Sequence, residues 1–341
     1  MTEPELLNRW SHLSLGKGRA IPLRNRVVIP SMASATADER GFATQATLDH
    51  YQLLTQAGAA LINVEYSFVS LDGRSEPNQL GASMDEHTAG LTAIAKIIRA
   101  RGTVAGLQLV HGGGKTSKDL TDGRLLAPSA IAVPVKGRDL EVPTAMTVQD
   151  ILQWQQNFLE ATRRATQAGF QLVELHAAHG YGFNQWLSPL TNQRIDDYGG
   201  SRDNRNRLLI ETIRSIRSEF PSLILGARIP GQDFIAGGLT LSDMIATAHD
   251  LVWAGVDYLS VSSGLGGWRR PGDRNMEGYL VEEARAIQRE ISCPVIGVGG
   301  IETGAFIDEL ICNRSISLAA VGRAILANPA QWGSTNLGAT L

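Results

Sequence analysis

Eight short apolar runs, each followed by a turn and then a segment with helical spacing, constrain the fold of this 341-residue chain more than any other feature. Continuous apolar runs of this length are typical of strands that are buried on both faces, as in a parallel sheet. They predict strands over 27–29, 59–64, 104–109, 172–175, 223–228, 258–261, 295–298 and 318–321. The amphipathic segments between them predict helices over 48–57, 91–101, 151–168, 208–220, 244–254 and 281–291.

Local signals mark the ends of several of these helices. The start Thr147–Asp150 is typical of an N-cap, because a side-chain acceptor stands ahead of an apolar run. Gly58, Gly169 and Gly255 each follow a helical segment and lead directly into the next strand. A glycine in that place commonly ends a helix that returns to a sheet through a short loop.

Eight strands alternating with helices over most of the chain indicate the α/β class and a (β/α)₈ TIM barrel. The rival is a doubly wound sheet, which usually carries a glycine-rich dinucleotide fingerprint after its first strand. After Ile29 the sequence runs Pro30–Ser34 and contains no glycine. The barrel is therefore preferred.

We expect one domain over residues 1–341, with the barrel core at about 23–327. Two long segments, 112–139 and 264–275, are predicted to form loops over the C-terminal face of the barrel.

Composition and charge exclude several classes of protein. Lys and Arg total 31 against 34 Asp and Glu, so no broad basic surface for nucleic acid is expected. No apolar run approaches the roughly 20 residues that a membrane-spanning helix needs. The acidic start lacks the pattern of a signal peptide. Cys293 and Cys312 are too few for a disulfide framework or a cysteine-rich cluster, and each is expected to be a buried thiol. We therefore predict a cytoplasmic protein.

Polar residues gather where a (β/α)₈ barrel has its active site, at the C-terminal ends of the strands. Buried strand ends rarely tolerate so many polar groups unless each has a partner. These residues are Glu65, Gln108, His111, Glu174, His176, His179, Tyr181, Arg228, Ser262, Ser263 and Arg323.

Three of these residues, His111, His176 and His179, come from adjacent predicted strands. They are open to three interpretations: a metal site, imidazoles with satisfied hydrogen bonds at strand ends, or residues that act on a substrate. Hydrolytic barrels with a metal often carry His-X-His on their first strand, and 27–32 has no histidine. No metal is expected.

A phosphate-binding site is predicted at the last two strands. The glycine-rich segment Gly297–Ile301 follows the seventh strand and precedes a helix expected from about Thr303. The eighth strand leads into Gly322 and Arg323. Barrels frequently bind phosphate with these two loops, through backbone N–H groups and a helix N-terminus. Arg323 is expected to add a charge-assisted contact.

The segment 175–189, Leu-His-Ala-Ala-His-Gly-Tyr-Gly-Phe-Asn-Gln-Trp-Leu-Ser-Pro, resembles the Old Yellow Enzyme family of FMN-dependent ene-reductases. The resemblance continues through 192–201 and 204–205, and it extends to 23–28, 108–111 and 322–323. It therefore covers nearly the whole chain.

The resemblance implies an FMN bound over the C-terminal mouth of the barrel. It implies that the segment from Pro30 to Ala33 lines one flavin edge, that Gln108 bonds the pyrimidine side, and that Arg228 lies near the N1–O2 edge. The phosphate would be held by four residues of the last two loops. The full set of implied cofactor residues is Pro30, Ser31, Met32, Ala33, Tyr66, Gln108, Arg228, Gly299, Gly300, Gly322 and Arg323.

The resemblance also implies a reaction. Reduced flavin, recharged by NADPH or NADH, delivers a hydride to the β-carbon of an α,β-unsaturated carbonyl compound. His176 and His179 would hold the carbonyl oxygen as an oxyanion hole does, and Tyr181 would supply the proton as general acid. The alternatives are an FMN barrel that acts on another substrate, for example as an oxidative demethylase, and a flavin-binding barrel without activity.

Four positions depart from the family pattern. Ala33 stands where the family usually has Cys or Thr, and Ala35 where related bacterial members have Tyr. Tyr66 replaces a small residue close to the flavin, and Gly114 replaces an Arg beside Lys115. Two arrangements of Tyr66 are open: the ring fills part of the space left at Ala33, or it turns aside into a loop.

Overall fold

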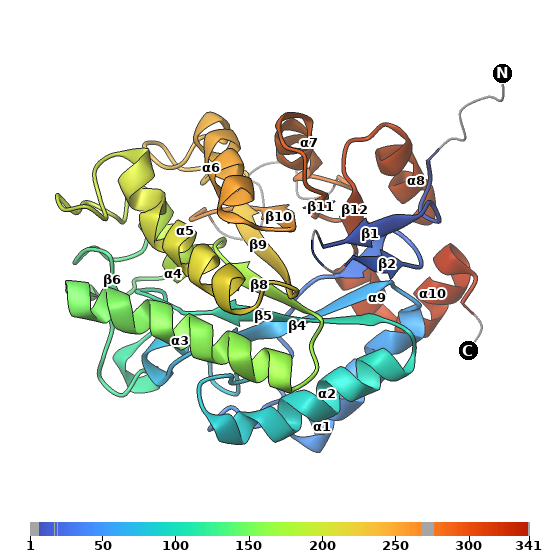
Figure 1. The fold of residues 1–341 in the computed structure, drawn as a ribbon, viewed down its shortest axis with the longest axis horizontal. Coiled ribbons are helices and arrows are strands. Elements are labelled where there is room, and N and C mark those ends of the chain that lie inside the picture. Colours follow the sequence, from blue (N-terminus) through green and yellow to red (C-terminus); the bar gives the residue numbers. More distant parts are fainter. Residues whose placement is uncertain (1–6, 17, 19, 267–275, 340–341) are drawn as a thin grey trace.

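The computed structural model describes residues 7–339 except 17, 19 and 267–275. Its centre is a closed barrel of parallel strands (Figure 1), which confirms the predicted α/β class and (β/α)₈ fold. In barrel order these are β3 (Val27–Ile29), β4 (Leu61–Phe68), β5 (Val104–Val110), β8 (Leu172–His176), β9 (Ile224–Pro230), β10 (Tyr258–Ser262), β11 (Val295–Gly297) and β12 (Leu318–Ala320). All eight coincide with the predicted runs.

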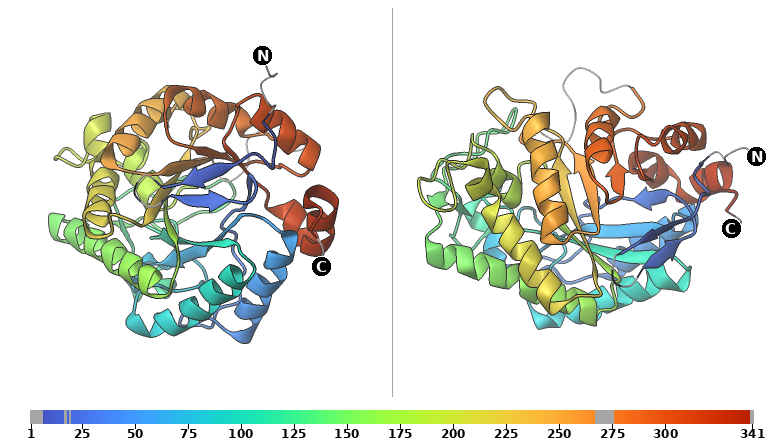
Figure 2. Two further views of the ribbon diagram at one scale, coloured as in Figure 1. Left: turned by 45° about the vertical axis from the view of Figure 1, so that its right-hand side comes forward. Right: turned by 45° about the horizontal axis from the view of Figure 1, so that its top comes forward.

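Helices surround this barrel (Figure 2). The main ones are α1 (Gln45–Leu54), α2 (Thr88–Ala100), α3 (Val148–Gln167), α5 (Arg202–Glu219), α6 (Leu241–Ala254), α7 (Val281–Glu290) and α8 (Gly304–Cys312). In α3 the buried residues Ile151, Trp154, Phe158, Ala161 and Ala165 are spaced three and four apart, so they form one apolar face toward the strands.

The predicted helix ends are confirmed. Thr147 caps α3: its hydroxyl accepts from the Asp150 N–H, and the Asp150 carboxylate accepts from the Thr147 N–H. Gly58, Gly169 and Gly255 have φ of 72°, 88° and 117°, the left-handed region in which a side chain is unfavourable.

Several short elements were not predicted. They are β1 (Leu13–Leu15), β2 (Ile21–Leu23), β6 (Leu126–Ala127), β7 (Thr144–Ala145), α4 (Gly182–Leu187), α9 (Arg323–Ala327), α10 (Pro329–Leu337) and the 3₁₀ turns 71–73, 85–87 and 118–120. A further 3₁₀ turn, 55–57, completes the predicted helical segment 48–57. The β1–β2 hairpin has a clear role. Leu15 and Leu23 pack in one cluster with Leu61, Val104 and Leu172, which begin three barrel strands. The hairpin therefore closes the N-terminal end of the barrel.

Cys293 is buried as expected, but the prediction for Cys312 was wrong, because this last residue of α8 is exposed. Of the two predicted loops, part of 264–275 lies outside the described residues. Among the helices that the structure describes, none combines the length and apolar character required to cross a membrane.

Candidate active site

A cavity of about 460 Å³ opens at the C-terminal ends of the barrel strands. It is lined by every residue that the sequence predicted for cofactor binding or catalysis. It also includes Lys115, Tyr279, Glu302, Ala320, Ala324 and Leu326, which were not assigned to the site. Three more lining residues were named in the sequence without a role of their own: Ser262 as a polar strand end, and Val298 and Ile301 within the glycine-rich segment.

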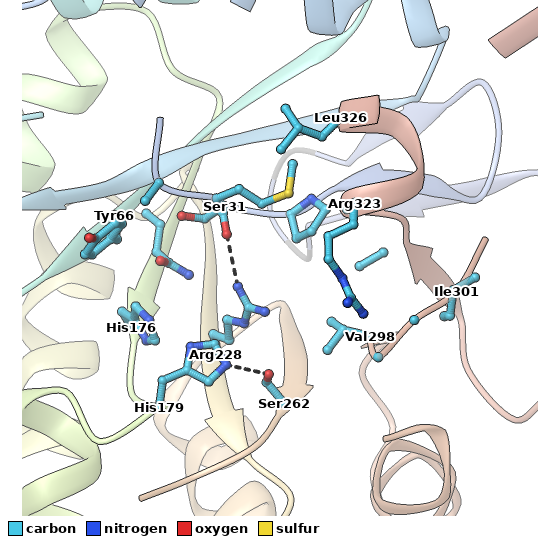
Figure 3. Close-up of a pocket in the computed structure, with 18 of the residues that line it drawn as sticks. Ser31, Tyr66, His176, His179, Arg228, Ser262, Val298, Ile301, Arg323 and Leu326 are labelled. Atoms are coloured by element: carbon cyan, nitrogen blue, oxygen red, sulfur yellow. Dashed lines mark hydrogen bonds between the residues drawn. The ribbon is translucent and has the colours of Figure 1, made fainter. Parts of the chain in front are cut away.

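The cavity has two chemically different ends (Figure 3). Tyr66, His176 and His179 lie at one side of the view, while Val298, Ile301 and Arg323 lie at the other, with Arg228 between them. We call the group Tyr66, Lys115, His176, His179 and Tyr181 the histidine end. We call the group Gly299, Gly300, Gly322 and Arg323 the glycine end.

The turn after β8 shapes the histidine end. His176 is the last residue of β8, and His179 follows with a φ of 59°, a left-handed conformation that is uncommon for a residue other than glycine. This backbone is held on two sides: the His179 N–H donates to the Ser263 carbonyl at 3.0 Å, and Lys115 Nζ donates to the His179 carbonyl at 2.6 Å. Strain maintained in this way is typical of functional sites.

The two imidazole rings meet at a centroid distance of 5.1 Å, with an angle of 84° between their planes. Burial, reinforced by the charge of Arg228, lowers the pKa of both His176 and His179 well below the usual value, so both are neutral at pH 7. His176 Nδ1 accepts from the Ala178 N–H at 3.3 Å, which leaves the proton on Nε2. His179 Nε2 lies 2.6 Å from the Ser262 hydroxyl. When that hydroxyl donates, the His179 proton is on Nδ1. With this tautomer of His179, the histidine end offers two N–H donors.

Tyr181 joins this pair from the start of α4. Its ring centroid is 4.8 Å from that of His176, and Lys115 Nζ lies 4.3 Å from the ring centre. Burial raises the pKa of Tyr181 to about 12 and lowers the pKa of Lys115 to about 8. At neutral pH the phenol thus keeps its proton beside an ammonium group.

The floor between the two ends is polar and buried. Gln108 Nε2 donates to one Glu174 oxygen at 2.7 Å, and the Tyr258 hydroxyl donates to the other at 3.1 Å. The position of Arg228 beside the histidine end follows from the strand register, because β9 pairs Arg228 with His176 of β8. Its Nη1 is 3.4 Å from the Ser31 carbonyl. Arg228 Nε and Ser31 Oγ have no hydrogen-bond partner among the described residues. Buried polar atoms without a hydrogen-bond partner are rare in proteins, so these two atoms indicate a bound ligand.

The glycine end is built mainly from backbone. Gly299 and Gly300 have φ of 116° and 68°, and a Cβ on Gly300 would lie 2.9 Å from the Tyr279 ring. A Cβ on Gly322 would lie 3.1 Å from Met32 Sδ. Arg323 is exposed, and its Nη2 is 3.4 Å from the Tyr279 hydroxyl. The chain therefore approaches the cavity closely here, as an anion-binding loop requires.

One part of the phosphate prediction needs correction. The helix expected from about Thr303 is present as α8, with Thr303 as its N-cap. However, the Glu302 and Thr303 N–H groups both donate to the Glu277 carboxylate at 2.7 Å. That helix start already holds an anion, so a phosphate here depends on the glycine loops and Arg323.

His111 does not join the other histidines. Its ring stacks on Trp154 at 3.9 Å, its Nδ1 accepts from the Gly113 N–H at 3.0 Å, and its Nε2 is 3.4 Å from Asp72. The three-histidine set considered as a metal site is therefore not assembled. In the part of the chain that the structure describes, no three His, Cys, Asp or Glu side chains are grouped to hold a metal ion.

The family described as the NADH:flavin oxidoreductase / NADH oxidase family matches residues 16–334. The chain belongs to this family. A relative named NADPH dehydrogenase from Geobacillus sp. is 36% identical over 312 residues, which cover 91% of this chain and 89% of the relative. The Old Yellow Enzyme resemblance is confirmed, and with it a flavoprotein oxidoreductase with FMN and a reduced nicotinamide.

Solved structures agree on the fold of this flavin oxidoreductase. An Old Yellow Enzyme homologue from Zymomonas mobilis superposes with a TM-score of 0.84 at 22% identity, covering 98% of this chain and 94% of the homologue. Morphinone reductase in complex with tetrahydroNAD superposes with a TM-score of 0.82 at 24% identity, covering 98% and 92%.

The cavity fits FMN on its own evidence. Arg228 Nε and Ser31 Oγ are buried polar atoms of the cavity floor without a hydrogen-bond partner among the described residues. A flavin ring has polar edges that would supply such partners. The close backbone approach at Gly299 and Gly300 is suited to a phosphate.

Among the lining residues that sequence reasoning missed, three make contact with residues of the predicted site. Ser262 was recognised as polar at a strand end but was given no role. Lys115 was noted only as a neighbour of Gly114. Tyr279 precedes α7 and carried no signal, because a single aromatic residue in a loop has many structural uses.

Proposed function

We propose that this family member is an FMN-dependent ene-reductase that reduces α,β-unsaturated carbonyl compounds and uses NADPH or NADH as reductant. The observation that carries the proposal is the histidine end: two neutral imidazoles with donor protons, beside a protonated phenol. The name of the Geobacillus relative, NADPH dehydrogenase, supports the choice of reductant.

Cofactor contacts are assigned to the floor and the glycine end. Pro30, Ser31, Met32 and Ala33 would line one flavin edge, Gln108 would bond the pyrimidine side, and Arg228 would face the N1–O2 edge. Gly299, Gly300, Gly322 and Arg323 would hold the phosphate, while Tyr66 would form a wall. The support is that all of these residues line one cavity. When bound and reduced, FMN supplies a hydride for the β-carbon of the substrate.

The histidine pair polarises the substrate carbonyl. Negative charge grows on that oxygen as the β-carbon is reduced, and donors held beforehand by the protein stabilise it. His176 is held by the Ala178 N–H, and His179 by the strained turn and Ser262. Because both rings are neutral, each donates one hydrogen bond without giving up a proton.

Tyr181 completes the reaction by giving its proton to the α-carbon of the substrate. Its raised pKa keeps the proton available at neutral pH. The enclosed position of the ring beside His176 brings the donor to the same end of the cavity as the carbonyl grip.

The test is anaerobic reduction of 2-cyclohexenone by the purified protein with NADPH and with NADH. We expect flavin-coloured protein and formation of cyclohexanone. Flavin that NADPH reduces but the enone does not reoxidise would favour another substrate, for example oxidative demethylation. Protein that binds FMN but transfers no electrons would indicate a binding barrel.

Three further predictions remain part of this proposal: a single domain over residues 1–341, a cytoplasmic location and no nucleic-acid partner. The near-balance of basic and acidic residues supports the last of these.

A further inference from the structure

We propose that Tyr66 is a positioning residue for the proton donor: its hydroxyl donates a hydrogen bond to the Tyr181 oxygen, directs the Tyr181 proton into the cavity and stabilises the phenolate that remains. This inference rests on the proposed function, and it concerns a residue at which the chain departs from its family.

The backbone of β4 places the Tyr66 side chain at the histidine end. The pairing of β4 with β5 shifts register between Val64 and Ser67, so Tyr66 lies in a β-bulge. Bulges next to active sites commonly redirect a side chain. The Tyr66 carbonyl accepts from Gln79 Nε2 at 2.7 Å, which fixes the residue from behind.

The side chain is enclosed by the catalytic residues. Tyr66 is 8% exposed, and its ring centroid is 5.5 Å from that of Tyr181 and 6.5 Å from that of His176. The ring therefore lines the cavity beside these two residues and does not turn aside into a loop.

The ring geometry brings the two phenols together, and we infer that Tyr66 is the donor. Burial raises the pKa of Tyr66 and the interaction with Tyr181 raises it further, which agrees with that role. Burial raises the pKa of Tyr181, whereas hydrogen bonds from Tyr66 and Ser75 lower it, as expected for an acceptor. An oxygen that accepts from Tyr66 and Ser75 keeps its own proton for another acceptor, and Tyr181 lines the cavity. The charges that act on Tyr181 are Glu76, Arg138 and the nearby Lys115.

The step is balanced. The O–H bond of Tyr181 breaks and its proton forms a C–H bond at the α-carbon, with the electron pair of the substrate enolate. The phenolate left on Tyr181 keeps the hydrogen bonds from Tyr66 and Ser75. A proton from solvent water then restores the phenol.

Tyr66→Phe isolates the hydroxyl, because it keeps the ring and the cavity wall. We expect the reoxidation of reduced protein by cyclohexenone to slow about three- to tenfold, the effect of one ordinary hydrogen bond. FMN affinity and the rate of reduction by NADPH are measured alongside, and the loss in the reoxidation rate should exceed any change in either. Tyr198→Phe is the matched control, since that hydroxyl bonds Glu211 outside the cavity and its loss should leave the rate as it is.

A second readout does not depend on turnover. The chain has six tyrosines, so fluorotyrosine-labelled protein gives a ¹⁹F spectrum in which Tyr66→Phe and Tyr181→Phe assign two resonances. Loss of the Tyr66 donor should move the titration of Tyr181 to higher pH. A Tyr181 titration that is identical in both proteins would overturn the inference.

Tyr181→Phe separates the two proposals. Wild-type reoxidation by this variant would remove Tyr181 from the reaction and end both. A slow Tyr181→Phe together with a Tyr66→Phe of wild-type rate would overturn the positioning role alone. If both variants are slow, the double variant should be no slower than Tyr181→Phe, because the two hydroxyls act as a unit.

Discussion

The two ends of the cavity are built in opposite ways. The histidine end depends on side chains brought together from distant parts of the sequence: Lys115 holds the His179 backbone, and Ser262 holds its ring. The glycine end depends on the backbone of two loops, with one exposed arginine. A single side-chain atom should therefore matter most at the histidine end. At the glycine end, adding a side chain to a glycine should be as harmful as removing the arginine side chain.

The largest effect is expected from His176→Ala or His179→Ala. Removing one oxyanion donor costs about 2.7–4 kcal/mol, so hydride transfer to cyclohexenone should slow about 100- to 1,000-fold. Stopped-flow reoxidation of the reduced protein measures this. His249→Ala, at an exposed position on α6, is the control. FMN affinity should not change. Normal rates in both active-site variants would remove the histidine end from the reaction.

Gly299→Ala tests the backbone of the glycine end. With φ at 116° and a Cβ only 2.8 Å from the Leu280 nitrogen, the substitution should cost about 2–3 kcal/mol of unfolding free energy. If the loop moves to relieve the strain, FMN affinity should fall by about 30- to 100-fold.

Gly338→Ala is the matched control for that variant. Its φ is 57°, and a Cβ there meets nothing within 4 Å, so only the strain of about 1 kcal/mol remains. Denaturant unfolding and FMN titration give both quantities. Equal effects of the two glycines would contradict a role for Gly299 beyond its conformation.

Arg323→Ala should have a smaller effect on the same end. A hydrogen bond to a charged group contributes about 1.5–3 kcal/mol, which corresponds to about ten- to hundredfold in FMN affinity. The exposed Arg289 of α7 provides the control substitution. Unchanged FMN retention in Arg323→Ala would overturn the phosphate assignment.

The smallest effect concerns Lys115. Burial lowers its pKa to about 8, so the ammonium beside the Tyr181 ring is present below pH 8 and is lost as the pH rises through that value. A cation over an aromatic ring contributes about 0.5–1 kcal/mol, so enone-driven reoxidation should fall two- to fivefold above pH 8. Lys115→Met should lack this step. The same step in the variant would assign it to another group.

The same difference between the two ends determined which features could be predicted from the sequence. The strands were predictable because their apolar runs are continuous, and Arg228 could be placed because it lies near the C-terminal end of one of them. The glycine end was predictable because Gly299 and Gly300 adopt positive φ angles, which favour glycine. Features of this kind depend on only a few neighbouring residues in the sequence.

The contacts of the histidine end were harder to predict from the sequence, because they join residues that are far apart in it. Nothing near Lys115 indicates that it reaches His179, 64 residues away. His111 has the same side chain as His176 and His179, yet it stacks on Trp154 and contacts Asp72 outside the cavity. Helix α4 was missed because all of its residues are buried, so it has no amphipathic pattern.

In our proposal, the histidine end stabilises a developing oxyanion, whereas the glycine end only binds the cofactor. Phenol binding tests it directly, because a phenolate imitates the enolate oxygen and gives a long-wavelength band with oxidised flavin. Phenol is titrated into protein saturated with FMN, and the dissociation constant is read from that band. We expect a wild-type dissociation constant in Arg323→Ala and at least tenfold weaker phenol binding in His176→Ala and His179→Ala. Equal phenol affinity in all four proteins would contradict it.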